Sequence, residues 1–185
     1  MTKKQIDIYT GDLYASREPV IIRTLLGSCV AVCLLDPANR IGGMNHILLP
    51  GNPDMKRFDF SARYGVNAME MLINKILVLG GDRRRLVAKV FGGAHVLREM
   101  PTKFDTGREI SKFVIAFLEN EKIKLISHDL GGSDTRRIYF HSDTGDVFLK
   151  RIPSMKDPGI FHMELKRLKK IIQKIEVRSD VTIFK

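Results

Sequence analysis

Hydrophobic and polar residues follow two different periods along this chain, and each period predicts a different secondary structure. Runs typical of β-strands occupy residues 5–9, 19–26, 29–36, 40–50, 85–94 and 123–132, and residues 136–152 indicate a β-hairpin around a turn at 143–146. Apolar residues at helical spacing predict helices over 62–79, 106–122 and 161–175, followed by an edge strand at 181–185. The buried face predicted for the first helix consists of Val66, Met69, Ile73, Ile76 and Leu77.

The order of these elements predicts the class of fold. Strands outnumber helices, and several strands follow one another as hairpins instead of alternating with helices. This order favours an α/β or α+β sandwich with mixed, largely antiparallel sheets over a doubly wound parallel fold. No repeat, low-complexity segment or linker divides the chain, so we expect a single domain over residues 1–185.

One predicted hairpin carries candidate chemistry. Cys29 opens the strand 29–36, and His46 lies in the apolar strand that returns after the turn at 36–39. A register that pairs Asp36 with Asn39 also places Cys29 directly opposite His46 on one face of the sheet, with Cβ atoms about 5 Å apart. At that separation a thiol and an imidazole can act as a nucleophile and its base.

The residues before the cysteine fit this interpretation. Gly27 and Ser28 keep the backbone slim, so a substrate carbonyl can approach and backbone N–H groups can point at a developing oxyanion. Thr24 would orient the second ring nitrogen of His46 through its hydroxyl or its backbone carbonyl. The candidate catalytic residues are therefore Cys29, His46 and Thr24, with Gly27 and Ser28 as weaker candidates for binding the oxyanion.

The same residues also have a purely structural interpretation. Cysteine is among the most frequently buried residues, and a lone histidine in an apolar strand is more often structural than catalytic. From spacing alone, both interpretations of Cys29 and His46 stay open. Cys33 shares the strand parity of Cys29, but the expected register places it opposite Gly42 with no base nearby, so we interpret it as core filling.

Six further polar residues are weaker candidates: His95, His128, His141, Asp129, Arg136 and Arg137. We expect the histidines to be structural or exposed and the aspartate to form a turn or a helix cap. The two arginines either recognise an acidic partner or simply lie on a strand surface. The Gly-Gly pairs at 92–93 and 131–132 are not phosphate-binding loops, because no Gly-Lys-Ser/Thr follows and no GxGxxG pattern is present.

Charge and apolar content narrow the class of protein. The formal net charge is +10, and basic residues gather at 82–85, 136–137 and 165–178. No aromatic residues interleave with these basic runs, as stacking on bases would require, so we do not expect nucleic-acid binding. The chain has no apolar run of about 18 residues and no signal-peptide core, so we expect a cytoplasmic protein without membrane insertion.

The cysteine count argues against a disulfide and a metal site. Cys29 and Cys33 lie four residues apart in one predicted strand, which separates them by about 13 Å, too far for a disulfide. They also lack the CxxC spacing of a zinc site. We therefore expect no structural disulfide and no bound metal.

Several long motifs occur in order from residue 24 to residue 150: "TLLGSCVAVCLLDP", "IGGMNHILLP", "SARYGVNAMEMLIN", "AKVFGGA", "DLGG", "RRIYF" and "TGDVFLK". Together they resemble the signature of the CheD family, the chemoreceptor glutamine deamidases of bacterial chemotaxis. Where that family usually reads close to "IGxRN", this chain has "DTGREI" at 105–110. The resemblance implies a three-layer α/β sandwich.

The resemblance also implies an enzyme, a protein-glutamine glutaminase that acts as an amidohydrolase. It assigns the nucleophile to Cys29, the base to His46 and the third member of a triad to Thr24. The reaction implied is conversion of glutamine side chains of methyl-accepting chemotaxis receptors to glutamate through a cysteine thioester, with release of ammonia and no cofactor. An alternative function stays open, a regulatory binding module acting on a CheC-type chemotaxis phosphatase, which is a candidate partner in either case.

Overall fold

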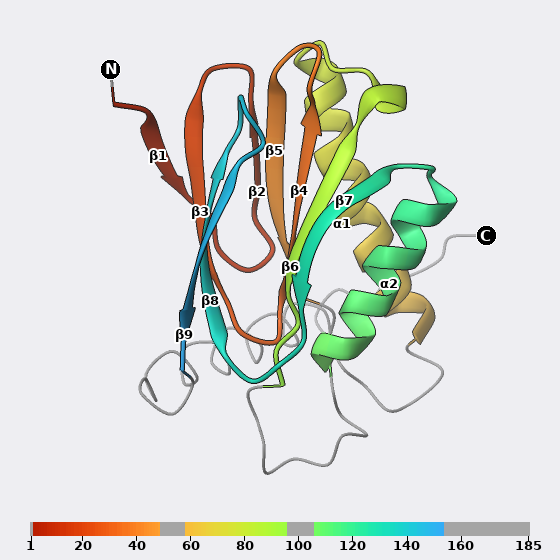
Figure 1. The fold of residues 1–185 in the computed structure, drawn as a ribbon. Helices are drawn as coiled ribbons and strands as arrows, with labels where there is room; N and C mark the ends of the chain where they lie inside the picture. The colour runs from red at the N-terminus through yellow and green to blue at the C-terminus, as the bar shows by residue number, and fades with distance from the viewer. Residues whose placement is uncertain (1, 49–57, 96–105, 154–185) are drawn as a thin grey trace, which may run out of the picture.

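The structure, a computed structural model, describes residues 2–48, 58–95 and 106–153. In this part of the chain two β-sheets stack on each other, and two helices cover the far face of one sheet (Figure 1). The arrangement is an α+β sandwich of three layers with mixed sheets, as the sequence predicted. No helix among the described residues is long and apolar enough to cross a membrane.

The first sheet has four strands in the order β1-β3-β8-β9. These are β1 (Lys4–Asp7), β3 (Val20–Leu26), β8 (Thr135–His141) and β9 (Val147–Ile152). The second sheet has five strands in the order β2-β5-β4-β6-β7, namely β2 (Leu13–Ser16), β5 (Ile41–Ile47), β4 (Val30–Asp36), β6 (Val87–Gly92) and β7 (Lys124–Leu130). β1 pairs with β3 and β6 with β7 in parallel, whereas the other pairings are antiparallel.

Helices α1 (Phe58–Val78) and α2 (Thr106–Asn120) pack on the five-stranded sheet, and a 3₁₀ turn at Arg83–Arg85 follows α1. Every residue of β4 and β5 is buried, because helices cover one face of these strands and the four-stranded sheet covers the other. The helix side of β5 is marked by Asn45, whose side-chain amide donates to the backbone carbonyl of Ala68 on α1. The opposite side of β5 therefore faces the four-stranded sheet.

Most predicted elements are confirmed within one to four residues of their expected ends. The strand β2 was missed, because its four residues, "LYAS", carry no apolar alternation. In α1 the predicted apolar face is confirmed at Met69, Ile73 and Ile76, but Val66 is 42% exposed. The predicted helix at 161–175 and the edge strand at 181–185 lie outside the described residues.

The predicted register of the β4–β5 hairpin is wrong by two residues. Asp36 pairs with Ile41 and not with Asn39, so the loop has four residues, with Arg40 at a positive φ of 54°. The longer loop is stabilised by the Asp36 carboxylate, which accepts from the backbone N–H groups of Ala38 and Asn39.

The corrected register moves both cysteines relative to β5. His46 lies opposite Ala31, and Cys33 lies opposite Met44 instead of Gly42. The pairing of β4 with β5 begins at Val30, so Cys29 lies one residue before the paired strand. The predicted direct pairing of Cys29 with His46 is therefore wrong.

Asp36 also connects this hairpin to the turn after α1. Its carboxylate is fully buried and accepts from the Asp82 backbone N–H at 2.9 Å and from the Arg85 guanidinium at 2.6 and 3.0 Å. The hydrogen bonds from Arg85 lower the pKa of Asp36 despite its burial. A buried carboxylate of this kind is stable only as long as its donors stay in place.

We predict that Asp36→Asn destabilises the fold by about 2 kcal/mol at pH 7, because it removes the charge that these donors surround. Since folding lowers the pKa of Asp36, its contribution is complete above the unfolded value of about 4 and is lost as the pH falls through the folded value. Urea unfolding at pH 7 and pH 3 should show the difference between parent and variant shrinking in acid. Glu119→Gln, at an exposed site on α2, is the control; an equal effect of the two substitutions at pH 7 would contradict the prediction.

Candidate functional site

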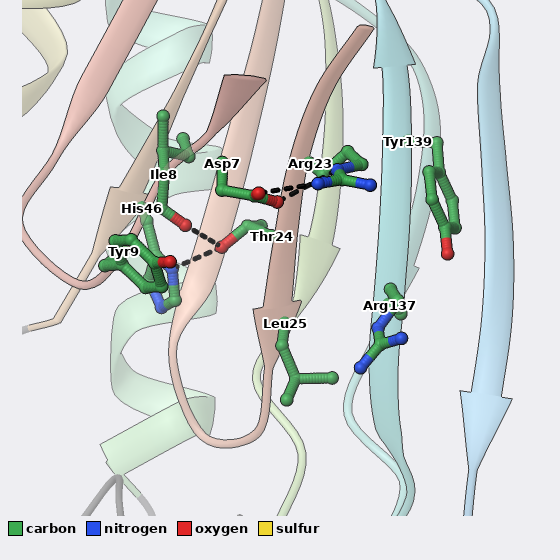
Figure 2. Close-up of a pocket in the computed structure, with 9 residues that line it drawn as sticks. All are labelled: Asp7, Ile8, Tyr9, Arg23, Thr24, Leu25, His46, Arg137 and Tyr139. Carbon is green, nitrogen blue, oxygen red and sulfur yellow. Dashed lines mark hydrogen bonds and ion pairs between the residues drawn. The ribbon is translucent and has the colours of Figure 1, made fainter. Parts of the chain in front are cut away.

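The two sheets meet through a hydrogen bond between His46 and Thr24. His46 extends from β5 and is 3% exposed, and its Nδ1 lies 2.8 Å from the Thr24 hydroxyl on β3 of the other sheet (Figure 2). The same hydroxyl donates to the backbone carbonyl of Ile8 at 2.8 Å. Of the two groups that the sequence offered for orienting His46, the structure places the Thr24 hydroxyl on the ring.

This chain of contacts determines which ring nitrogen of His46 carries the proton. A hydroxyl has a single hydrogen, and the Ile8 carbonyl can only accept, so the Thr24 hydrogen points to Ile8. The Thr24 oxygen must then accept from His46, which requires hydrogen on Nδ1. In the neutral ring Nε2 therefore keeps its lone pair, as a general base requires.

A short N-terminal segment holds His46 from a second side. The backbone N–H of His46 donates to the backbone carbonyl of Asp12, and the backbone carbonyl of His46 accepts from the N–H of Gly11. The Thr10 hydroxyl lies 3.5 Å from Nε2. The sequence "YTGD" at 9–12 indicates a turn but carries no signal for where that turn packs, so this contact could not be predicted.

Cys29 lies in the connection between β3 and β4 and is 1% exposed. Two backbone contacts fix this connection: the Cys29 carbonyl accepts from the N–H of Gly93, and the Gly27 carbonyl accepts from the N–H of Ala94. In a trans peptide the N–H points opposite to the preceding carbonyl, so the Ser28 N–H points away from the 92–94 segment. Ser28 itself is only partly buried.

Glycines allow the segments around Cys29 to approach closely. Gly92 has φ 114°, and a Cβ there would collide with the Cys29 carbonyl oxygen. Gly107, near the start of α2, lies against Gly93, where a Cβ would come within 2.6 Å of the Gly93 oxygen. Gly107, one residue of the segment that departs from the family pattern, thus supports the loop that holds Cys29, and only a residue without a side chain fits there.

Cys33 differs from Cys29 in its surroundings. It lies within β4, fully inside the core, and burial raises the pKa of its thiol well above the usual range. A thiol that stays protonated is a poor nucleophile. Neither cysteine forms a disulfide, as the spacing predicted.

The other histidines have separate positions. His128 is exposed on β7, and the ring of His141 contacts the Lys3 ammonium at 3.2 Å and packs against Phe148. The His95 backbone N–H donates to the carbonyl of Gly132. Among the residues that the structure describes, no three His, Cys, Asp or Glu side chains gather closely enough to hold a metal ion.

Asp129 and Arg136 form a structural ion pair and not a recognition site. Arg136 is 3% exposed, and its guanidinium donates to Asp129 at 2.7 and 2.9 Å and to the Gly131 carbonyl at 2.7 Å. Burial alone would raise the pKa of Asp129, but the hydrogen bonds from Arg136 and Arg151 outweigh it and lower the pKa. The expectation of a turn or cap for Asp129 is therefore wrong, and Arg136 is not available to a partner.

A pocket of about 330 Å³ reaches His46 and Thr24 from the side of the four-stranded sheet (Figure 2). The residues that line it are Asp7, Ile8, Tyr9, Arg23, Thr24, Leu25, His46, Arg137 and Tyr139. Arg23 is neutralised in the pocket wall, since its guanidinium donates twice to the Asp7 carboxylate. Of these lining residues, only Thr24, His46 and Arg137 are candidates from the sequence alone.

Comparison with known proteins gives a consistent result. Residues 48–151 match the family model described as CheD chemotactic sensory transduction. A "probable chemoreceptor glutamine deamidase CheD" of Shewanella oneidensis is 42% identical over 98% of this chain and 88% of its own length. Proteins with the same description from Dechloromonas aromatica and Hahella chejuensis are 40% and 38% identical, over 85% and 96% of this chain and 78% and 83% of their own lengths.

The contact between Thr24 and His46 makes a prediction that does not depend on function. In Thr24→Val the Nδ1 proton loses its acceptor, so the neutral His46 ring should change from one tautomer to a mixture. Nitrogen-15 NMR of labelled histidine at alkaline pH reports the two nitrogens separately. Thr24→Ser, which keeps a hydroxyl, is the matched control and should retain the Nδ1–H form; a parent spectrum showing Nε2–H would refute the assignment.

Proposed function

The chain belongs to the CheD family, and from that premise we propose that it is a chemoreceptor glutamine deamidase with Cys29 as nucleophile and His46 as base. The substrate is a glutamine side chain in the cytoplasmic, helical region of a methyl-accepting chemotaxis receptor, and the products are glutamate and ammonia. The observation that carries the proposal is the hydrogen-bonded series Ile8–Thr24–His46, which leaves Nε2 as the basic nitrogen of the buried His46 ring.

Acylation begins when His46 Nε2 takes the thiol proton of Cys29. The sulfur attacks the carboxamide carbon, a C–S bond forms, and the carbonyl electron pair moves to the oxygen. The Ser28 N–H, which points away from Ala94, is our candidate for binding that oxyanion, with the glycine at 27 leaving room for the substrate. When the oxyanion collapses, the C–N bond breaks and protonated His46 gives its proton to the leaving ammonia.

Deacylation uses water. His46 Nε2 accepts a proton as the water oxygen attacks the thioester carbon, and the C–S bond then breaks to release a carboxylic acid. The thiolate recovers the proton from His46, so one water is consumed for each ammonia released. Thr24 acts through His46 as a positioning residue, since its hydroxyl holds the ring in the required tautomer through both half-reactions.

We predict that Cys29→Ala and His46→Ala each lower deamidation of a receptor cytoplasmic fragment by at least about 10³-fold. Deamidation is read by mass spectrometry as replacement of a side-chain NH2 by OH. Cys33→Ala is the matched control, because it removes the other buried thiol, four residues along in β4, and should leave the rate of the folded protein unchanged. If the Cys29 and His46 variants deamidate as well as the parent, the mechanism is wrong.

The same experiment separates the enzyme from a regulatory binding module. A chain that only regulates a CheC-type phosphatase would bind that protein without changing the mass of any receptor glutamine. Parent protein that binds the phosphatase but never deamidates a receptor fragment would contradict our proposal and support that alternative.

Replacement of Thr24 tests its role in positioning. We predict that Thr24→Val lowers kcat for deamidation about 10- to 100-fold with little change in KM, because the ring still exists but spends less time in the productive tautomer. Thr24→Ser should retain most of the activity. Equal losses in the two variants would show that the methyl group, and not the hydroxyl, is what matters at this position.

A further inference from the structure

Two unpaired cations lie directly opposite each other on the outer face of the four-stranded sheet. Arg137 on β8 pairs in register with Lys150 on β9, and both side chains are exposed. Side chains alternate between the two faces of β8, and Ile138 and Phe140 are buried, so Arg137 points away from the core. Like charges directly opposite on neighbouring strands destabilise a sheet, which makes this pair a feature that the fold alone does not explain.

Other arginines of the same sheet are neutralised by carboxylates. Arg23 binds Asp7, and Arg136 and Arg151 share Asp129. Among the described residues no hydrogen bond or ion pair is formed by the side chain of Arg137 or Lys150. Within the described part of the chain, the outer face therefore carries two positive charges that no carboxylate neutralises.

This pair of cations adjoins the pocket that reaches His46. Arg137 lines the pocket together with Leu25, its register partner on β3 (Figure 2). The pairing of β1 with β3 ends at Arg23, after which the N-terminal chain turns toward His46 and leaves the β3 edge at Leu25 uncovered by β1. Because the pocket lining continues from Leu25 and Arg137 to Thr24 and His46, a side chain that entered at this edge would approach His46, and the segment that carried it would lie over β8 and β9.

The spacing of the cations suits a helix. Neighbouring strands lie about 4.8 Å apart, so β8 and β9 follow β3 at about 5 and 10 Å. Successive turns of an α-helix advance about 5.4 Å. A helix lying across the strands with one residue in the pocket would thus hold side chains one and two turns away above Arg137 and Lys150.

We propose that Arg137 and Lys150 are specificity residues that bind acidic side chains one and two helical turns from the target glutamine. The inference rests on the proposed deamidase function and adds the sequence context that the enzyme selects. A carboxylate-bearing helix fits better than a phosphate backbone, because the wall of the pocket also carries Asp7 and because, among the described residues, only Arg137 and Lys150 are cations without a carboxylate partner on this outer face. Exposed Phe148, beside Lys150 on β9, offers apolar contact to a helix.

The test compares matched enzymes on matched substrates. The enzymes are the parent, the double variant Arg137→Gln/Lys150→Gln, and the control Arg17→Gln/Lys124→Gln, which removes the same charge from exposed sites in loop 17–19 and on β7. The substrates are receptor cytoplasmic fragments that carry either Glu or Gln one and two turns from the target glutamine. KM and kcat are measured from ammonia release at low and at physiological salt.

We expect the double variant to raise KM about 3- to 30-fold on the acidic fragment while kcat stays constant, and the control to match the parent. The parent should show the same rise in KM on the neutral fragment. The double variant acting on the neutral fragment should show little further rise in KM. Added salt should raise the KM of the parent on the acidic fragment and should have little effect on the KM of the double variant.

Three results would overturn the inference. In the first, the double variant keeps the parental KM on the acidic fragment. In the second, the KM of the control variant rises as much as that of the double variant. In the third, the double substitution weakens binding only to duplex DNA or to phosphatidylserine vesicles tested in parallel. In each of these cases the parent still deamidates, so the proposed function survives. A parent that deamidates no fragment removes the proposed function and this inference together.

Discussion

A hydrogen bond from His46 Nδ1 to the Thr24 hydroxyl oxygen joins the two sheets of this protein at the candidate site. Thr24 belongs to the four-stranded sheet and His46 to the five-stranded sheet, and the Thr24 oxygen can accept from the ring only because its hydrogen is committed to Ile8. The contact therefore depends on the distance between sheets and on the apolar layer that fixes that distance, including the buried side chains of Ile22 and Phe140. The packing of the core thus helps to determine which ring nitrogen of neutral His46 carries the proton.

The candidate nucleophile and base are held by different means. His46 is oriented through its side chain, whereas Cys29 is fixed through backbone carbonyls on both sides of Ser28. Backbone restraint suits a nucleophile whose neighbouring N–H groups have to receive an oxyanion, because it fixes the peptide planes as well as the side chain. The cost is a requirement for residues without Cβ atoms where segments cross, as at Gly92 and Gly107.

Sequence patterns predicted what depends on periodicity and could not predict what depends on local turn geometry or distant pairing. The strands and helices followed from apolar spacing, whereas the register of the β4–β5 hairpin was wrong by two residues, so that His46 lies opposite Ala31 and not opposite Cys29. The error itself came from a turn widened by Arg40 at positive φ, a conformation that arginine rarely adopts. The ion pair of Asp36 with Arg85 joins residues 49 positions apart, and no local signal marks it.

The position of Ile8 has a practical consequence for any version of this protein that starts later in the chain. A start site or protease cut just beyond residue 8 would leave Thr24, Cys29 and His46 in the sequence, and motif searches would still recognise the chain. Such a shortened protein would lack the carbonyl that orients the Thr24 hydroxyl and the strand that closes one side of the four-stranded sheet. Sequence motifs alone would thus classify as complete a protein whose base had lost its fixed tautomer.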